Sequence, residues 1–103
     1  MKIFVCYTMR DGEITPSHLR RVERILKTEG HSVFIDYLNN DSVHKQQRVV
    51  SELKSSDEVI LLVSPKVKDS EWVSIELAYA KQNHIQVIPY KLSNNILIKQ
   101  DYA

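Results

Sequence analysis

Two residues in the last third of the chain combine an aromatic ring with a carboxylate. Trp72, the single tryptophan, is followed four positions later by Glu76, and apolar residues surround the glutamate from 75 to 80. Residues four apart share a face of a helix, so the indole and the carboxylate can line one wall of a site. A carboxylate among apolar neighbours is either an ordinary helix-surface residue or a group that does chemistry. The sequence leaves both readings open.

The elements that must position these residues begin with four segments rich in Ile, Val, Phe or Tyr. They cover residues 2–8, 32–37, 58–64 and 85–92. Several of these segments are apolar at consecutive positions, which is typical of strands covered on both faces of a sheet. We therefore predict four buried strands.

Amphipathic patterns between these segments predict three helices. The first follows Pro16 and ends near Gly30, the second lies within residues 41–57, and the third lies within 70–84 with Ser70 as its N-cap. The apolar side of the second helix is predicted to comprise Val43, Val49, Val50 and Leu53. That of the third is predicted to comprise Trp72 or Val73 with Ile75, Leu77, Ala78 and Ala80.

This alternation predicts an α/β protein with a flavodoxin-like, three-layer α/β/α architecture and a central parallel sheet of strand order 2-1-3-4. Residues 93–103 form either a fifth edge strand or a tail, and residues 1–103 are expected to make one domain. Ligands of such sheets bind at the carboxyl ends of the strands. The candidate residues should therefore lie at that edge.

Composition narrows the classes of function. The formal charge of +1 provides no strongly basic field, so nucleic acid is not expected as the partner. The single cysteine, Cys6, indicates a reducing compartment, and the short apolar runs predict no membrane span, so we expect a cytoplasmic protein or module without membrane association. With two glycines, the glycine-rich nucleotide loops are excluded. No metal site is expected, because the histidines and the cysteine do not cluster at ligand spacing.

Three stretches, in order, resemble Toll/interleukin-1 receptor (TIR) domains of the bacterial TIR-like type. The stretch "IFVCYTMRD" (3–11) is similar to their F-I-S-Y-S-x-x-D opening, and "GHSVFIDYLNNDS" (30–42) resembles their second strand and BB loop. The W-x-x-x-E-L element at 72–77 is the most specific. Cys6 departs from the pattern by replacing the first serine, and Val73 replaces the cysteine after the tryptophan.

Many TIR domains use the glutamate of this W-x-x-x-E-L element to cleave NAD+. The resemblance therefore implies an NAD+ nucleosidase with Glu76 as its catalytic residue, which releases nicotinamide and forms ADP-ribose or a cyclic ADP-ribose signal in bacterial antiphage defence. The nicotinamide leaves as a neutral molecule and needs no proton, so one carboxylate that stabilises the oxocarbenium-like transition state is sufficient. NAD+ is then a substrate, and no cofactor is expected.

The resemblance also implies which residues bind the substrate. Tyr7, Thr8 and Arg10 would form the wall opposite the catalytic residue, with Arg10 on the pyrophosphate and Thr8 on a ribose or phosphate. Asp36, at the end of the second predicted strand, would lie on the nicotinamide side, and Trp72 would lie beside the glutamate.

Two other functions remain open. The chain could be a TIR interaction module that self-associates, or binds a partner effector protein, and does no chemistry. It could also be an enzyme like the nucleoside deoxyribosyltransferases, since "ELAYA" (76–80) is similar to their E-L-G-x-A stretch. That enzyme also cleaves an N-glycosidic bond.

Overall fold

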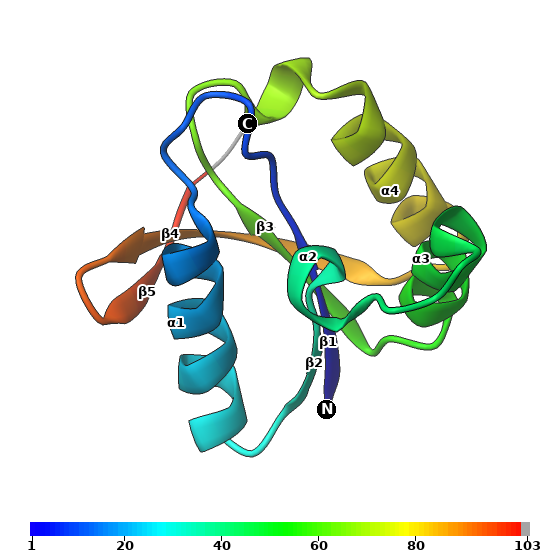
Figure 1. Cartoon of the computed structure of the whole chain (residues 1–103), viewed down its shortest axis with the longest axis horizontal. Helices are drawn as coiled ribbons and strands as arrows, with labels where there is room; N and C mark the ends of the chain where they lie inside the picture. Colours follow the sequence, from blue (N-terminus) through cyan, green and yellow to red (C-terminus); the bar gives the residue numbers. More distant parts are fainter. Residues whose placement is uncertain (102–103) are drawn as a thin grey trace.

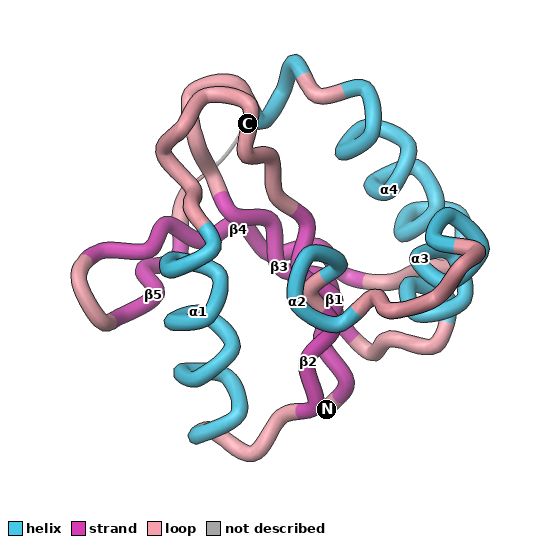
Figure 2. The backbone as a smooth tube through the Cα atoms, viewed as in Figure 1, coloured by secondary structure: helices cyan, strands magenta, loops and turns pink. Residues whose placement is uncertain are grey.

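The structure is a computed structural model that describes residues 1–101. Its centre is a five-stranded sheet of order β2-β1-β3-β4-β5 (Figure 2). Its strands are β1 Lys2–Cys6, β2 Ser32–Phe34, β3 Glu58–Leu62, β4 Gln86–Ser93 and β5 Ile96–Lys99. The first four are parallel, and β5 pairs antiparallel with β4. The predicted order 2-1-3-4 is confirmed, and the fifth edge strand is present. Positions 102–103 of the predicted edge strand or tail lie outside the described residues.

Helices cover both faces of this sheet (Figure 1), which confirms the flavodoxin-like architecture. They are α1 Pro16–Thr28, α2 Asp36–Asn39, α3 Lys45–Lys54, the 3-10 helix η1 Val67–Asp69, and α4 Glu71–Gln82. On the α1 face, Leu19 and Val22 pack with Ile3 of β1. On the opposite face, Leu53 of α3 and Val73 of α4 pack with the other side of β1.

Local sequence sets both ends of α1 and the start of α4 where expected. The hydroxyl of Thr15 accepts a hydrogen bond from the N–H of His18, and the His18 ring accepts one from the N–H of Thr15, so the two residues form a capping box before Pro16. Gly30 follows α1 with a φ of +91°, a conformation that favours glycine. The hydroxyl of Ser70 accepts from the N–H of Val73 at 3.2 Å and starts α4, as predicted.

The segment after β2 differs from the prediction. β2 ends at Phe34, and Asp36 begins the short helix α2 instead of ending a strand. The side chain of Asn39 accepts the Ile35 N–H at 2.7 Å, and the Asn39 N–H donates to the Ile35 carbonyl at 2.8 Å. These local bonds engage the Ile35 N–H and C=O groups that a longer strand would need for its ladder.

Three apolar residues lie outside the buried faces predicted for them: Val43, Ile75 and Ala78, the last of which is exposed on α4. Val43 precedes α3, which begins at Lys45, and is 91% exposed, so it does not belong to the buried side of that helix. Ile75 of α4 is 43% exposed. The buried positions of α4 are 73, 76 and 80, whose spacing of three and four residues selects a face that contains Glu76 and leaves Ile75 outside.

Candidate active site

Glu76 lies on the face of α4 that packs against the sheet. Val73, one turn before it, and Ala80, one turn after it, belong to the same core cluster as Cys6, the last residue of β1. The glutamate between them is 5% exposed. The carboxylate is therefore held at the carboxyl end of β1, where α/β sheets bind ligands, and does not point into bulk water.

The surroundings of this carboxylate disfavour its charge. Burial raises the pKa of Glu76 to about 7, and the negative charge of Asp36 acts in the same direction. The side chains of Cys6 and Trp72 oppose this rise in the pKa of Glu76, Cys6 more strongly. In residues 1–101, no described ion pair includes Glu76. The group therefore changes its protonation state near neutral pH.

Cys6 is the direct neighbour of the glutamate. Its side chain is fully buried, and burial raises the pKa of the thiol well above its ordinary value, with a further rise from the Glu76 charge. The thiol therefore stays protonated and can donate its S–H. Sequence reasoning noted Cys6 as a departure from the family pattern and gave it no role at the site. The signal available in the sequence was the alternation of side chains along a strand, which places Cys6 and Tyr7 on opposite faces of the sheet.

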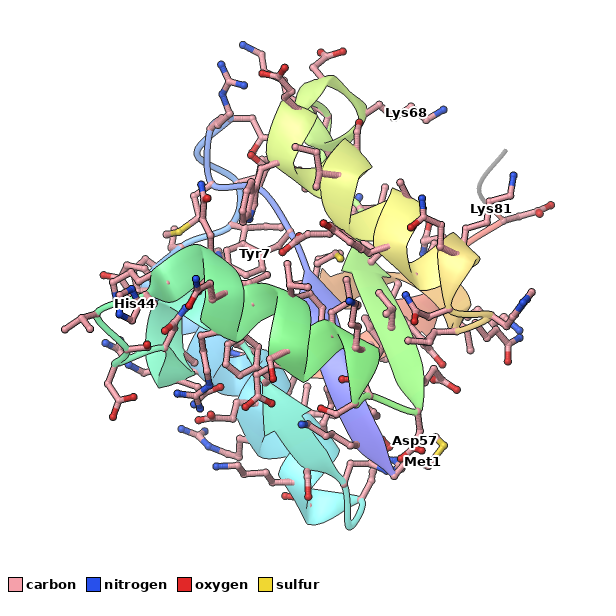
Figure 3. All side chains as sticks on the ribbon, turned by 90° about the vertical axis from the view of Figure 1, so that its right-hand side faces the viewer. Met1, Tyr7, His44, Asp57, Lys68 and Lys81 are labelled. Atoms are coloured by element: carbon pink, nitrogen blue, oxygen red, sulfur yellow. The ribbon has the colours of Figure 1, made fainter. Side chains whose placement is uncertain are left out.

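Tyr7 joins the end of β1 to helix α2. Its hydroxyl accepts the N–H of Tyr37 at 3.0 Å, and in Figure 3 its side chain lies between α4 and the α2–α3 segment. Burial raises the pKa of Tyr7 to about 12; the Tyr37 N–H opposes this rise, and the charges of Asp36 and Glu76 add to it. The phenol is therefore neutral at physiological pH.

Thr8 and Arg10 occupy the loop that follows β1. Thr8 is 5% exposed, and its hydroxyl accepts the backbone N–H of Arg10 at 3.3 Å, whereas Arg10 itself is exposed. Asp11 accepts the N–H of Lys66 at 2.9 Å and that of Glu13 at 3.2 Å. The Lys66 N–H is the main reason that the pKa of Asp11 is lowered. Asp11 thus braces this loop against the loop after β3.

Asp36 and Trp72 complete the surroundings of Glu76. The carboxylate of Asp36 accepts the side-chain N–H of Asn40 at 2.7 Å, and its charge acts on both Glu76 and Tyr7. Trp72 is 36% exposed, so part of its indole is available to a ligand. The fold thus gathers Tyr7, Asp36, Trp72 and Glu76, while Thr8 and Arg10 lie along the adjoining loop; the binding roles expected for all of them stay predictions.

The site is packed. Glu76 and Thr8 are each 5% exposed. A hollow of about 530 Å³ lies elsewhere, between α1 and the β4–β5 hairpin, and its lining includes Ile25 and Ile96. Within residues 1–101, no group of three His, Cys, Asp or Glu side chains is placed to hold a metal ion. A substrate that reaches Glu76 must therefore displace part of the surrounding structure.

Together, the topology and the position of Glu76 define a doubly wound α/β domain with a buried glutamate at the carboxyl edge of its sheet. The profile of the TIR domain family matches residues 3–101, and the chain belongs to this family. A search of curated protein sequences gave no match. Across residues 1–101, no helix has both the length and the apolar character needed to cross a membrane.

Two solved structures share the fold. A 2-deoxyribosyltransferase from Bacillus psychrosaccharolyticus matches 93% of this chain and 76% of its own, with a TM-score of 0.64 and 16% identity. A 2-desoxiribosyltransferase from Leishmania mexicana matches 98% of this chain and 79% of its own, with a TM-score of 0.64 and 13% identity. At such identities the similarity shows the architecture alone.

Proposed function

We propose that this TIR domain is an NAD+ nucleosidase and that Glu76 is its catalytic residue. The observation that carries the proposal is a buried carboxylate without a cationic partner among the described ion pairs, at the carboxyl end of β1. An unpaired buried charge costs folding free energy, so such groups concentrate at functional sites. Glu76 also lies within the W-x-x-x-E-L element of the family to which the chain belongs.

The reaction breaks the bond between the ribose C1′ and the pyridinium nitrogen of NAD+. The electron pair of that bond goes to the nitrogen, so nicotinamide leaves neutral, and positive charge develops on the ribose. The ionised Glu76 stabilises that charge and accepts hydrogen bonds from ribose hydroxyls. Water then attacks C1′ and loses a proton to give ADP-ribose; attack by a ring nitrogen of the adenine gives a cyclic product instead.

Residues around the glutamate suit the parts of this substrate. Trp72 offers an exposed indole face for an aromatic ring, and Arg10 supplies a cation for the pyrophosphate. Thr8 and Tyr7 supply hydroxyls on the opposite side, and Asp36 lies toward the nicotinamide. Because the site is packed, helix α2 has to move before the substrate reaches Glu76.

The same proposal extends to the cellular setting. Assembly with other TIR domains, or with a partner effector protein, would open the packed site, and the enzyme would then act in the cytoplasm as part of bacterial antiphage defence. Depletion of NAD+ or release of a cyclic signal would be the output.

One observation favours a second candidate. The fold similarity to two deoxyribosyltransferases supports an enzyme that cleaves the N-glycosidic bond of a nucleoside. Glu76 would act there on a deoxyribose rather than on NAD+. The third possibility, a TIR interaction module without chemistry, predicts no turnover of either substrate.

The test measures nicotinamide release from NAD+ over a range of protein concentrations. Glu76→Gln should lower the rate by at least about a hundredfold, because the amide is nearly isosteric and carries no charge. Glu52→Gln is the matched control, since Glu52 lies on the neighbouring helix and pairs with cations. Equal rates for the wild type and Glu76→Gln would reject the catalytic role. Release of a free base from deoxynucleosides, without NAD+ cleavage, would select the second candidate.

A further inference from the structure

We propose that this chain forms a two-fold symmetric dimer through the outer edge of β5, where a second copy of the strand pairs antiparallel with the first about Leu97. The contact joins the two sheets into one continuous sheet. It specifies a surface for the assembly with other TIR domains that the proposed function includes, and in that respect it rests on the proposed function.

The outer edge of β5 has backbone groups available for pairing. β5 is the last strand of the sheet, and within residues 1–101 no further strand pairs with it. The Gln100 N–H donates to the Pro89 carbonyl of β4 at 2.9 Å, and the direction of the backbone groups alternates along a strand. The N–H and C=O groups of Ile98 therefore face β4, whereas those of Leu97 and Lys99 face outward. Such an edge is a template for another strand.

The opposite edge of the sheet, formed by β2, offers much less. The Ser32 N–H donates to the Met1 carbonyl at 2.9 Å and so faces β1, which leaves Val33 as the residue of this three-residue strand that faces outward. The next outward N–H, that of Ile35, is already bonded by the Asn39 side chain at 2.7 Å. β5 is therefore the edge that is open to pairing.

The sequence of β5 identifies a second copy as the partner. Leu97 is flanked by an isoleucine on each side, at 96 and 98, so the strand reads the same in both directions from its centre. A two-fold axis at Leu97 places that residue opposite its own copy and Ile96 opposite Ile98 of the second copy. Cross-strand side-chain pairs of this kind stabilise a sheet. Lys99 comes opposite the uncharged Asn95, so no like charges face each other.

The contact buries apolar surface on a strand that is already held in place. Ile96 is 60% exposed and Ile98 is 43% exposed, and the dimer brings these side chains together. On the other face of the strand, Leu97 packs with the α1 cluster, and Arg21 of α1 donates to the Asn94 carbonyl at 3.1 Å. An edge ordered in advance lowers the entropy cost of association. β5 lies on the side of the molecule away from α3 and α4 (Figure 1), so the dimer leaves the candidate active site free.

The experiment measures molecular mass by sedimentation, together with amide hydrogen exchange, as the protein concentration is raised. One pair of strand edges makes a small interface, so we expect half of the protein to be dimeric at roughly 100 μM. Exchange at the Leu97 and Lys99 amides should slow as the dimer forms, because these groups become bonded to the second copy. Exchange at the Ile98 amide, which faces β4, should change little and serves as the internal control.

Two variants at position 99 separate the backbone bond from the side chain. Lys99→Pro removes an outward N–H and no bond to β4, so it should leave the fold intact. Two bonds are lost in each dimer, and the dissociation constant should rise at least about tenfold. Lys99→Ala keeps the N–H and is the matched control, which should associate like the wild type.

Cross-linking tests the register and does not depend on Lys99→Pro being folded. A mixture of the single variants Ile96→Cys and Ile98→Cys should form a disulfide-linked dimer on mild oxidation, much faster than either variant alone, because only the mixture places two cysteines opposite each other. Equal rates in the mixture and in the separate variants would overturn this pairing. A protein that stays monomeric at every concentration would overturn the second copy as the partner and leave the edge to a strand of another protein. A dimer paired through β5 that releases no nicotinamide would instead overturn the proposed function.

Discussion

The two ends of β1 hold two glutamates in opposite ways. At its amino end, Lys2 pairs with Glu52 of α3 at 2.7 Å, and Arg48 pairs with the same carboxylate at 3.0 Å. Partial burial pushes the pKa of Glu52 upward, but the bonds from Lys2 and Arg48 outweigh it and lower the pKa overall. At the carboxyl end of β1, Cys6 faces Glu76 of α4, which has no described cationic partner and a pKa raised to about 7.

This difference separates a structural carboxylate from a candidate catalytic one. Both residues lie on helices that cover the same face of the sheet, so the side-chain type and the layer do not distinguish them. The two glutamates differ in whether a neighbouring cation compensates for the free-energy cost of burying the carboxylate charge. A compensated carboxylate adds to folding stability, whereas an uncompensated one reduces it and keeps its charge available for a substrate.

The largest expected effect on stability concerns the pH dependence that Glu76 imposes. Because its folded pKa of about 7 exceeds the ordinary value of 4.5, the penalty is absent below 4.5, grows between these two values and is complete above about 7. Glu76→Gln should therefore raise the free energy of unfolding at pH 8 by about 3 kcal/mol. At pH 5.5, the gain in the free energy of unfolding, measured by urea denaturation, should be about 2 kcal/mol smaller than at pH 8. A gain independent of pH would show that the carboxylate is not destabilised in the folded state.

The opposite sign is expected for Glu52. Its folded pKa is lowered, so its contribution to stability is present above the ordinary value and is lost as the pH falls through the folded one. Glu52→Gln should lower the free energy of unfolding at pH 7 by about 1 to 2 kcal/mol, because two cations lose their partner near the surface. The loss should shrink in 1 M salt, which screens surface pairs. An equal loss at low and high salt would contradict an ionic origin.

The starts of the two helices offer a further comparison. α4 begins with Ser70, whose hydroxyl caps the helix, whereas His44 at the start of α3 makes no capping bond through its side chain. Ser70→Ala should cost about 1 kcal/mol of folding free energy, and His44→Ala should cost less than about half of that. Thermal unfolding of the two variants measures the difference. Equal losses would mean that the capping bond contributes nothing to holding the helix that carries Glu76.

The smallest expected effect on stability lies at the contact between β1 and α2. Tyr7→Phe removes the acceptor of the Tyr37 N–H, which is then able to bond to water, so the loss should be about half a kcal/mol. Amide hydrogen exchange at Tyr37 should accelerate more than exchange in the strands. If α2 must move to admit NAD+, the same variant should lower the protein concentration needed for nicotinamide release. Unchanged exchange at Tyr37 would show that this bond does not hold α2 in place.

Much of the architecture could be predicted because its signals are local. Runs rich in Ile, Val, Phe or Tyr indicated the four parallel strands, Pro16 with Gly30 bounded the first helix, and Ser70 marked the start of α4. The prediction was wrong after β2, where the side chain of Asn39 bonds its own backbone neighbourhood and turns the chain into α2. Such competition between side-chain and ladder bonds depends on geometry that residue types alone do not specify.

The amino-acid sequence by itself indicated the order of the main strands and helices, the family, and Glu76 as the candidate catalytic carboxylate. Hydrophobic periodicity, helix caps and a short motif are local properties of the chain, so they can be recognised without the tertiary structure. The tertiary structure decided the environment of that carboxylate. In the folded chain, Cys6 lies near Glu76, and Asp36 lies near both Glu76 and Tyr7. The cations Arg48 and Lys54 of α3 lie over aromatic rings instead of pairing with Glu76. Burial and charge compensation arise between segments distant in sequence, so only the folded chain sets the pKa of Glu76.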